Sequence, residues 1–432
     1  MIGMRKLTIG LLAATVSTIA LQAADVKVIH AGELLAVPGE AAKAEQTIVI
    51  ENGRIKEVRD GFVDAKTFGD DVKFIDLSSS FVMPGMMDMH VHMQGELGPD
   101  GDSKTLRLST ADRGMMSVMY AGKTLQAGFT TVRDLGAEPT QMNALRDGIK
   151  KGWVTGPRII ASAGLAATGG HGDVDGMRHD LLEKYTPKTI CDGPYECRKA
   201  VRYGVKYGAD VIKITATGGV LSDTNTGTGQ QMTNDELQEI MDTAHSLGRK
   251  VAAHAHAADG INAALRAGVD SIEHGTYANA ESHRLFKEGG AYLVPTMLAG
   301  DTVVQMAKTS DFLPPDIKAK ALRVGADLIA NFKASVKAGV KIAFGTDSGV
   351  SSHGTNAREA VLMNEAGMSS MDVIKSATVN AADLINMSDS LGTIEAGKHA
   401  DIIATDGNAL ADIKELLDVD FVMKAGKVHK NK

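Results

Sequence analysis

The sequence has few aromatic residues and no block rich in lysine or arginine. Its net charge of -7 and its pI near 6.0 offer no electrostatic attraction to nucleic acid. Aromatic residues make up 4% of the 432 residues whereas glycine occurs 47 times, a balance that suits many short turns better than a long helical bundle. The hydrophobic content of 44% excludes a mostly disordered chain. The length allows one large domain with an accessory domain, or two to three smaller domains.

Long hydrophobic runs are missing beyond the N-terminus. The chain begins MIGMRKLTIGLLAATVSTIALQAADVKV, with basic residues at Arg5-Lys6, an apolar stretch over residues 7–21 and a small-residue cleavage site ending at Ala23. This pattern is typical of a secretory signal peptide over residues 1–23. An uncut membrane anchor is the alternative, but the apolar stretch is shorter than the roughly 20 residues that a membrane span needs. We therefore expect an exported protein in a bacterial periplasm, without a stable membrane span after processing.

Cysteine is almost absent. The only two cysteines, Cys191 and Cys197, lie in CDGPYEC, where Gly193-Pro194 can turn the chain back on itself. An oxidising compartment favours a disulfide between them over two free thiols.

Several segments repeat one pattern, which is an amphipathic helix, a glycine that ends it and a short apolar strand. Examples are TLQAGFTTVRDLG, VKYGADVIKITATGG, ALRAGVDSIEHGT and VKAGVKIAFGTDSG. Strands that alternate with helices are parallel and joined by right-handed crossovers, so about eight of them close most simply into an α/β fold of the (β/α)8 TIM-barrel type. An open doubly wound sheet is the alternative, which polar residues at many strand ends disfavour. The expected strands are residues 83–92, 130–135, 157–162, 210–216, 250–256, 271–275, 291–296 and 341–347.

The two flanks of this region read differently. QTIVIENGRIKEVRDG near the N-terminus reads as two strands around a hairpin turn at Asn52-Gly53, and VDFVMKAGKVHK near the C-terminus reads likewise. We expect residues 24–82 and 391–432 to form one composite, small β-sandwich-like domain. The barrel then occupies residues 83–390.

Two histidines stand one residue apart in FVMPGMMDMHVHMQGE. In a strand, His90 and His92 point to the same face about 7 Å apart, so both can reach one cation. A pair of hydrogen-bonded histidines at a strand end is the alternative. The other strand ends must decide between these readings.

Metal-binding residue types end four further strands. They are Lys213 in DVIKITATGG, His254 in VAAHAH, His274 in SIEHGT and Asp347 in FGTDSG. A barrel builds its active site at the C-terminal ends of its strands, and four imidazoles with a carboxylate suit zinc, manganese or cobalt. A lysine between Ile212 and Ile214 would lose the solvation that stabilises its charge if it were buried. It would then either pair with a carboxylate or react with carbon dioxide to give a carbamate.

These motifs resemble those of the amidohydrolase superfamily with a binuclear metal centre. The resemblance also covers GFTTVRD, ATGGHGD and the flanking GRI, MPG and AGKHADI, and it spans nearly the whole mature chain. ATGGH, IKITATGGV, GQQMT and HGTNA are similar to one branch, the metal-dependent dipeptidases and carboxypeptidases, with prolidase-like Xaa-Pro dipeptidases and ochratoxin-hydrolysing relatives.

The resemblance implies two divalent ions per chain, with zinc expected, and a homo-oligomer. The implied ligands are His90, His92 and Asp347 for one ion, His254 and His274 for the other, and N-carboxylated Lys213 for both. Strand alternation puts His254 and His256 on one face, so geometry alone does not separate them. The choice of His254 rests on the family's use of the first histidine of that strand.

The implied chemistry is amide hydrolysis. Two cations that share a water hold a hydroxide at neutral pH and polarise a carbonyl, and Asp347 serves as acid and base. His171, in the glycine-rich ATGGHGD, is expected to donate to the substrate carbonyl, with a solvated loop histidine as the alternative. His353 is expected to contact a substrate carboxylate.

The expected small-molecule substrate is a dipeptide or an N-acyl amino acid. Val294, Met297 and Val350 near the last strand ends favour a neutral, apolar or proline C-terminal residue, unless Asp173 or Asp175 reaches the pocket. A lactonase, an esterase or a deaminase on the same scaffold is an alternative, although Lys213 argues against a deaminase. A non-catalytic exported metal carrier is a further alternative.

Overall fold

The computed structural model describes residues 25–136, 139–222 and 227–432. The predicted signal peptide over residues 1–23 lies outside the described residues. Within the described ranges, no helix is both long enough and apolar enough to cross a membrane.

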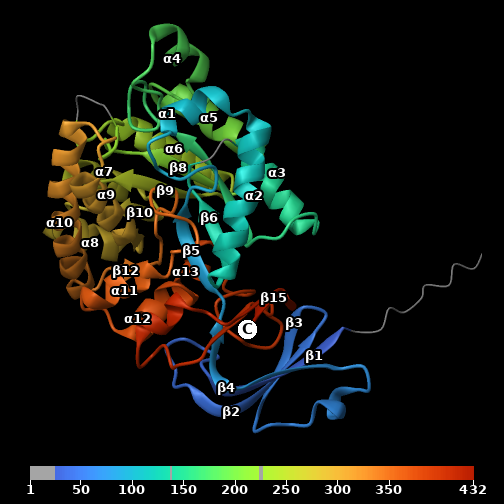
Figure 1. Ribbon diagram of the computed structural model, residues 1–432. Helices are drawn as coiled ribbons and strands as arrows, with labels where there is room; N and C mark the ends of the chain where they lie inside the picture. Colours follow the sequence, from blue (N-terminus) through green and yellow to red (C-terminus); the bar gives the residue numbers. More distant parts are fainter. Residues whose placement is uncertain (1–24, 137–138, 223–226) are drawn as a thin grey trace, which may run out of the picture.

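A sheet of eight parallel strands forms the barrel wall in the described part of the chain (Figure 1). The order is β12-β11-β10-β9-β8-β7-β6-β5. The strands are β5 (Met86–Val91), β6 (Phe129–Asp134), β7 (Arg158–Leu165), β8 (Val211–Thr215), β9 (Lys250–Ala255), β10 (Ser271–His274), β11 (Tyr292–Val294) and β12 (Lys341–Ile342). Each predicted strand overlaps one of them, and the (β/α)8 barrel is confirmed.

The seam between β5 and the segment after β12 closes the barrel. Met89 N donates to Phe344 O at 2.8 Å, and Asp347 N donates to His90 O at 2.7 Å. Strand β12 is much shorter than the predicted 341–347 because the chain then leaves regular geometry, reaching a φ of 57° at Asp347. The irregular segment still hydrogen-bonds to β5, so it places Asp347 beside His90.

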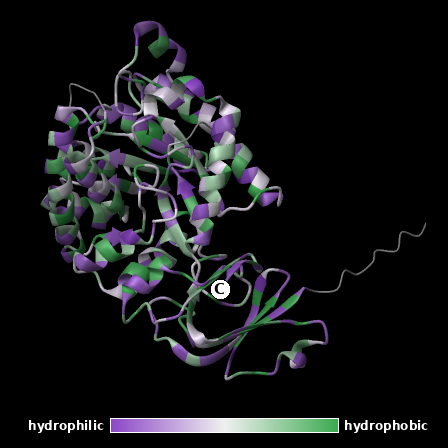
Figure 2. Cartoon of the chain, in the orientation of Figure 1, coloured by the Kyte–Doolittle hydropathy of each residue, from purple (hydrophilic) through white to green (hydrophobic). Residues whose placement is uncertain are grey.

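Helices cover the outside of the barrel, and they carry both hydrophobic and hydrophilic residues (Figure 2). In α5, the buried residues Cys197, Ala200, Val201 and Gly204 recur at the helical spacing. The helices are α1 (Gly101–Arg107), α2 (Thr110–Gln126), α3 (Pro139–Lys150), α4 (His179–Tyr185), α5 (Pro194–Lys206), α6 (Asn234–Ser246), α7 (Ala258–Ala267), α8 (Ala280–Gly289), α9 (Met297–Thr309), α10 (Pro315–Lys337), α11 (Arg358–Glu365), α12 (Ser370–Ser376) and α13 (Val379–Leu384), with short 3-10 helices at η1 (Ala65–Phe68) and η2 (Ile413–Leu417).

Both ends of the chain build a second sheet, as predicted. Its seven strands, counted over the described residues, lie in the order β15-β14-β13-β4-β1-β2-β3. They are β1 (Val26–Leu34), β2 (Lys43–Glu51), β3 (Arg54–Asp60), β4 (Lys73–Pro84), β13 (Ile402–Thr405), β14 (Phe421–Lys424) and β15 (Lys427–Asn431). Side chains from both halves, including Ile29, Ile48, Ile402 and Phe421, share one core.

The predicted hairpin turn at Asn52 and Gly53 is present, with φ values of 52° and 79°. A Cβ at Gly53 would lie 2.5 Å from Ala425 O. Glycine is therefore required both for the positive φ and for the close approach of the two hairpins.

The two cysteines form the predicted disulfide. Cys191 and Cys197 are bonded to each other at the start of α5, and Cys191 N donates to Ala166 O at 3.0 Å after β7. The disulfide and this hydrogen bond therefore attach the segment between β7 and α5, which carries α4, to the barrel.

Candidate metal centre

Side chains of metal-binding type meet where the barrel strands end. They are His90 and His92 at the end of β5, Lys213 on β8, His254 on β9, His274 on β10 and Asp347 after β12. All of them line one cavity of about 1170 Å³. The structure thus brings together the residues that the sequence singled out.

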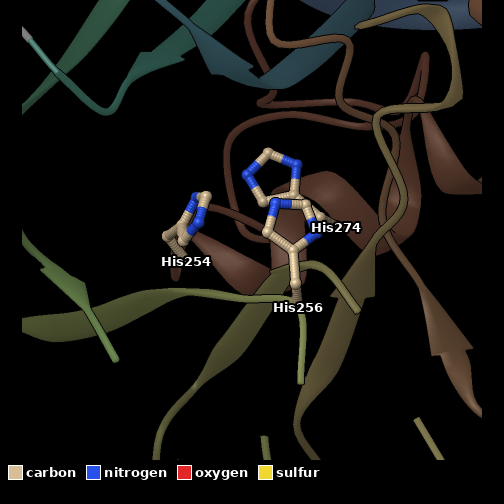
Figure 3. Close-up of side chains that lie close together, drawn as sticks. All are labelled: His254, His256 and His274. Carbon is tan, nitrogen blue, oxygen red and sulfur yellow. The ribbon is translucent and has the colours of Figure 1, made fainter. Parts of the chain in front are cut away.

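Two groups of ligand atoms lie close enough to hold cations. His90, His274 and Asp347 offer atoms that all lie within 4.8 Å of one another, and so do His254, His256 and His274 (Figure 3). His256 is therefore as well placed as His254 to bind a cation, as expected for two side chains on the same face at the end of β9. His92 is in neither group, but its Nε2 lies 2.9 Å from Asp347 Oδ1.

The donor atoms suit divalent cations. Burial lowers the pKa of His90 to about 4 and that of His256 to about 3, and it holds the pKa values of His254 and His274 well below the ordinary value. These imidazoles are therefore neutral, which is the form that binds metals. Oδ1 of Asp347 is buried and lies 2.9 Å from His92 Nε2, yet among the described residues it makes no hydrogen bond of good geometry. A cation at this point would satisfy the carboxylate oxygen.

Lys213 lines the same cavity, near the carboxylates of Glu273, Asp347 and Asp134 but in direct contact with none of them. Its side chain is buried, and burial lowers the pKa of its amine to about 8. No hydrogen bond or ion pair of its Nζ is found within the described ranges. The charged form is therefore poorly compensated at this position.

A buried ion pair orients His90. Glu273 Oε2 lies 2.9 Å from His90 Nδ1, and Arg133 Nη2 donates to Glu273 Oε1 at 2.9 Å. Arg133 Nε also donates to Met89 O at 2.7 Å. Although burial opposes ionisation of Glu273, Arg133 and His90 lower its pKa to about 2. A metal-ligating histidine that is held through its other nitrogen has a fixed ring orientation. No sequence pattern singled out this pair, although Glu273 is the neighbour of His274 in SIEHGT.

A second arrangement holds His274. Its Nδ1 lies 2.7 Å from Thr296 Oγ1, and Thr296 has a φ of 51° directly before α9. The fully buried carboxylate of Glu359 on α11 accepts the N–H groups of Met297 at 2.9 Å and Leu298 at 2.6 Å. Glu359 thereby fixes the start of α9 and the left-handed residue that contacts the histidine.

His171 lies in the cavity wall rather than in solvent. Its ring centroid is 4.2 Å from that of His254, and its Nδ1 lies 3.1 Å from Ser222 Oγ. Burial lowers the pKa of His171 to about 4, so the ring is neutral near pH 7. The solvated alternative is therefore wrong, and His171 remains a candidate to contact substrate.

His353 does not line the cavity, contrary to its predicted contact with substrate. Its ring packs on Tyr120 with a centroid distance of 4.5 Å, and its Nε2 lies 3.1 Å from Gly95 O. Its backbone N–H also donates to Glu96 at 2.8 Å. The segment after Asp347 folds against α2, which turns this histidine into a packing residue.

The cavity has one apolar wall. Leu97, Val220, Leu221, Val303, Val324, Leu328 and Val350 line it. Of the apolar residues named from the sequence, only Val350 contributes, because Val294 and Met297 are buried in the core. Asp173 and Asp175 are not among the lining residues. The helices α9 and α10, which supply much of this wall, were not assigned to the site from the sequence.

Residues 81–429 match the model of the Amidohydrolase family, and the chain belongs to that family. With the barrel and its strand-end cluster, this membership makes the protein a metal-dependent hydrolase that acts on carbon–nitrogen bonds. Its branch is the one that contains prolidase-like and ochratoxinase-like proteins, as the following similarities show.

Similar proteins include an ochratoxinase and solved peptidases. An ochratoxinase from Aspergillus niger is 33% identical over 370 residues, which cover 81% of this chain and 75% of the relative. A solved Xaa-Pro dipeptidase with bound methionine is 40% identical, with a TM-score of 0.89 and coverage of 94% of this chain and 100% of that chain. A solved prolidase complexed with N-methylphosphonate-L-proline is 32% identical, with a TM-score of 0.85 and the same coverage.

Proposed function

We propose that this amidohydrolase cleaves dipeptides or N-acyl amino acids that carry a neutral, apolar residue or proline on the carboxyl side of the scissile bond. The main observation behind the proposal is that the strand-end cluster and the apolar wall line the same cavity. Similarity to the Xaa-Pro dipeptidase and the prolidase supports a peptide substrate. The ochratoxinase is a relative that is not named as a peptidase, so amides other than dipeptides, such as N-acyl amino acids, belong to the proposal as well.

The proposed centre holds two divalent ions, with zinc expected. One ion would be held by His90, His92 and Asp347 and the other by His254 and His274. Lys213 would hold both as a carbamate, which forms when the neutral Nζ bonds to the carbon of carbon dioxide and loses a proton. The burial of this lysine supports that reaction because it lowers the pKa of the amine to about 8, despite the nearby carboxylates. Divalent ions at such a site lower the pKa of a water molecule and polarise a carbonyl.

The protein's own residues supply proton transfer and orientation. Asp347 accepts a proton from water on a carboxylate oxygen and returns it to the leaving nitrogen. His171, which keeps Nδ1 beside Ser222, offers Nε2 as a hydrogen-bond donor to the carbonyl oxygen. The apolar wall excludes water from one side of the substrate, which strengthens both interactions.

Export to a bacterial periplasm through the signal peptide belongs to the same proposal. The disulfide between Cys191 and Cys197 supports it because such bonds persist in oxidising compartments. Assembly into a homo-oligomer stays a prediction from the family resemblance.

A substrate screen with metal analysis on the same sample tests the proposal. Dipeptides ending in leucine, phenylalanine or proline and N-acyl forms of the same amino acids are offered to protein of measured zinc, manganese and cobalt content. Matched esters and lactones serve as the competing class. Hydrolysis of the amides supports the proposal, whereas a fully loaded protein that cleaves only esters, or nothing, contradicts it.

A further inference from the structure

The proposed substrates all carry a free carboxylate, and a partly enclosed cavity must supply a cation for it. His353 cannot do so because it lies outside the cavity. Among the described lining residues, the full charges are on Arg113, Lys188, Lys213, Glu96 and Asp347. Lys213 and Asp347 belong to the proposed metal centre. The remaining cations are Arg113 and Lys188.

Arg113 is held rigidly at the start of α2. Its backbone N–H donates to Ser109 O at 3.1 Å, and Ser109 and Asp112 form a capping box. The carboxylate of Asp112 accepts from Ser109 N at 2.9 Å and from Ser109 Oγ at 2.6 Å. The acid next to Arg113 is therefore engaged in the helix cap rather than with the guanidinium.

The second nearby acid is also engaged elsewhere. Glu96 Oε1 accepts the backbone N–H of His353 at 2.8 Å. Within the described residues, no ion pair and no side-chain hydrogen bond of Arg113 is found, so its guanidinium donors are available for a ligand. Arg113 is half-buried whereas Lys188 is exposed. Arginine also binds a carboxylate through two parallel hydrogen bonds, which lysine does not.

We propose that Arg113 binds the free carboxylate of the substrate, so that the enzyme acts only on amides whose carboxyl-side residue is C-terminal. This inference rests on the proposed function and narrows it to an exopeptidase. Blocking the carboxylate, as in an amide or a C-terminally extended peptide, removes the group that Arg113 recognises.

The test compares Ala-Leu with Ala-Leu amide in the metal-loaded enzyme and in Arg113→Gln. In the parent enzyme we expect kcat/KM to be higher for the free acid. Loss of a charged hydrogen bond predicts an increase of about 10- to 100-fold in KM for the acid in Arg113→Gln, without a comparable change for the amide. Arg113→Lys should recover part of the loss. Arg107→Gln, an exposed charge removal on the neighbouring helix α1, is the matched control.

Metal content and melting temperature are measured on every variant, which separates carboxylate binding from damage to the centre or the fold. Equal losses for the acid and the amide in Arg113→Gln would overturn the inference. So would a selective loss in Lys188→Gln with Arg113→Gln unchanged. A parent enzyme that cleaves no amide refutes the proposed function itself, whereas one that cleaves both substrates equally well refutes only the role of Arg113.

Discussion

Glu273 presents one carboxylate oxygen to Nδ1 of His90 at 2.9 Å, and both side chains are buried. Arg133 occupies the other oxygen of Glu273. Glu273 therefore holds His90 in place but is not free to bind a cation itself, because its two oxygens are engaged with His90 and Arg133. Several expected outcomes depend on such relationships.

Replacing Glu273 with Gln should weaken metal binding. The amide can keep the shape but leaves Arg133 without its carboxylate and gives His90 a weaker partner. Loss of such a supporting contact typically costs about 10- to 100-fold in metal affinity. Chelator competition on the purified variant measures it. Glu239→Gln, which removes a carboxylate from the more exposed ion pair with Arg198, is the control. Equal metal affinities in the two variants would show that Glu273 has no role in holding His90.

Removing the ions should lower both activity and stability. The purified protein is expected to bind about two divalent ions per chain, because ligands from five strands converge there. Binding only to the folded state raises stability by RT ln(1 + [L]/Kd), about 4 kcal/mol at a ligand excess of 1,000 over Kd. Metal analysis and thermal unfolding before and after chelation measure the effect, with re-addition of zinc as the control. A preparation that is fully active with one ion contradicts the binuclear centre.

Lys213→Ala should abolish activity, and small carboxylic acids should partly restore it by occupying the place of the carbamate. The expectation follows from the burial of this lysine in the cavity that holds the ligand groups and from the absence, among the described residues, of a direct ion pair to its amine. Turnover with increasing formate or acetate is the measurement. The same acids should not restore Asp347→Asn, where a ligand and the proton acceptor are lost together. Full activity of Lys213→Ala without added acid would exclude the bridging role.

The apolar wall predicts the order of substrates. Xaa-Leu, Xaa-Phe and Xaa-Pro should be cleaved with higher kcat/KM than Xaa-Arg, because no unengaged carboxylate outside the metal centre is found among the described lining residues. An unpaired, buried cation costs several kcal/mol. A preference of tenfold or more for Xaa-Arg, about 1.4 kcal/mol in the transition state, would reverse this reading. Val303→Asp should shift the order toward Xaa-Arg.

The barrel could be predicted from the sequence because its strands obey a local rule. Every barrel strand after β5 follows a helix and a glycine with positive φ, as Gly268 and Gly290 do in left-handed conformations after α7 and α8. The ligands could be found for the same reason, since strand ends converge in a barrel. Strand β12 was overestimated because apolar character continues through Phe344 after the regular pairing stops.

The rest of the site depends on contacts between distant segments. His353 and His171 both follow strand ends in glycine-containing loops, yet one packs against Tyr120 and the other lines the cavity. No local pattern distinguishes them, because loop packing decides the direction of each ring. The sequence gives no local sign of the role of Glu359 either, because its hydrogen bonds to the start of α9 join residues that are 61 and 62 positions apart.

The pairing of β4 with β13 makes the barrel an insertion between neighbouring strands of the small sheet. Pro84 lies opposite Ile402, so β4 leaves the ribosome long before its partner. At typical synthesis rates this delay is about 15 to 60 s. During that time β4 presents an unpaired edge, which is a template for wrong strand pairing. A chain that stops before residue 402 would contain every strand of the barrel but would leave this edge of β4 without its partner β13. Early termination should therefore produce aggregates rather than a smaller soluble enzyme.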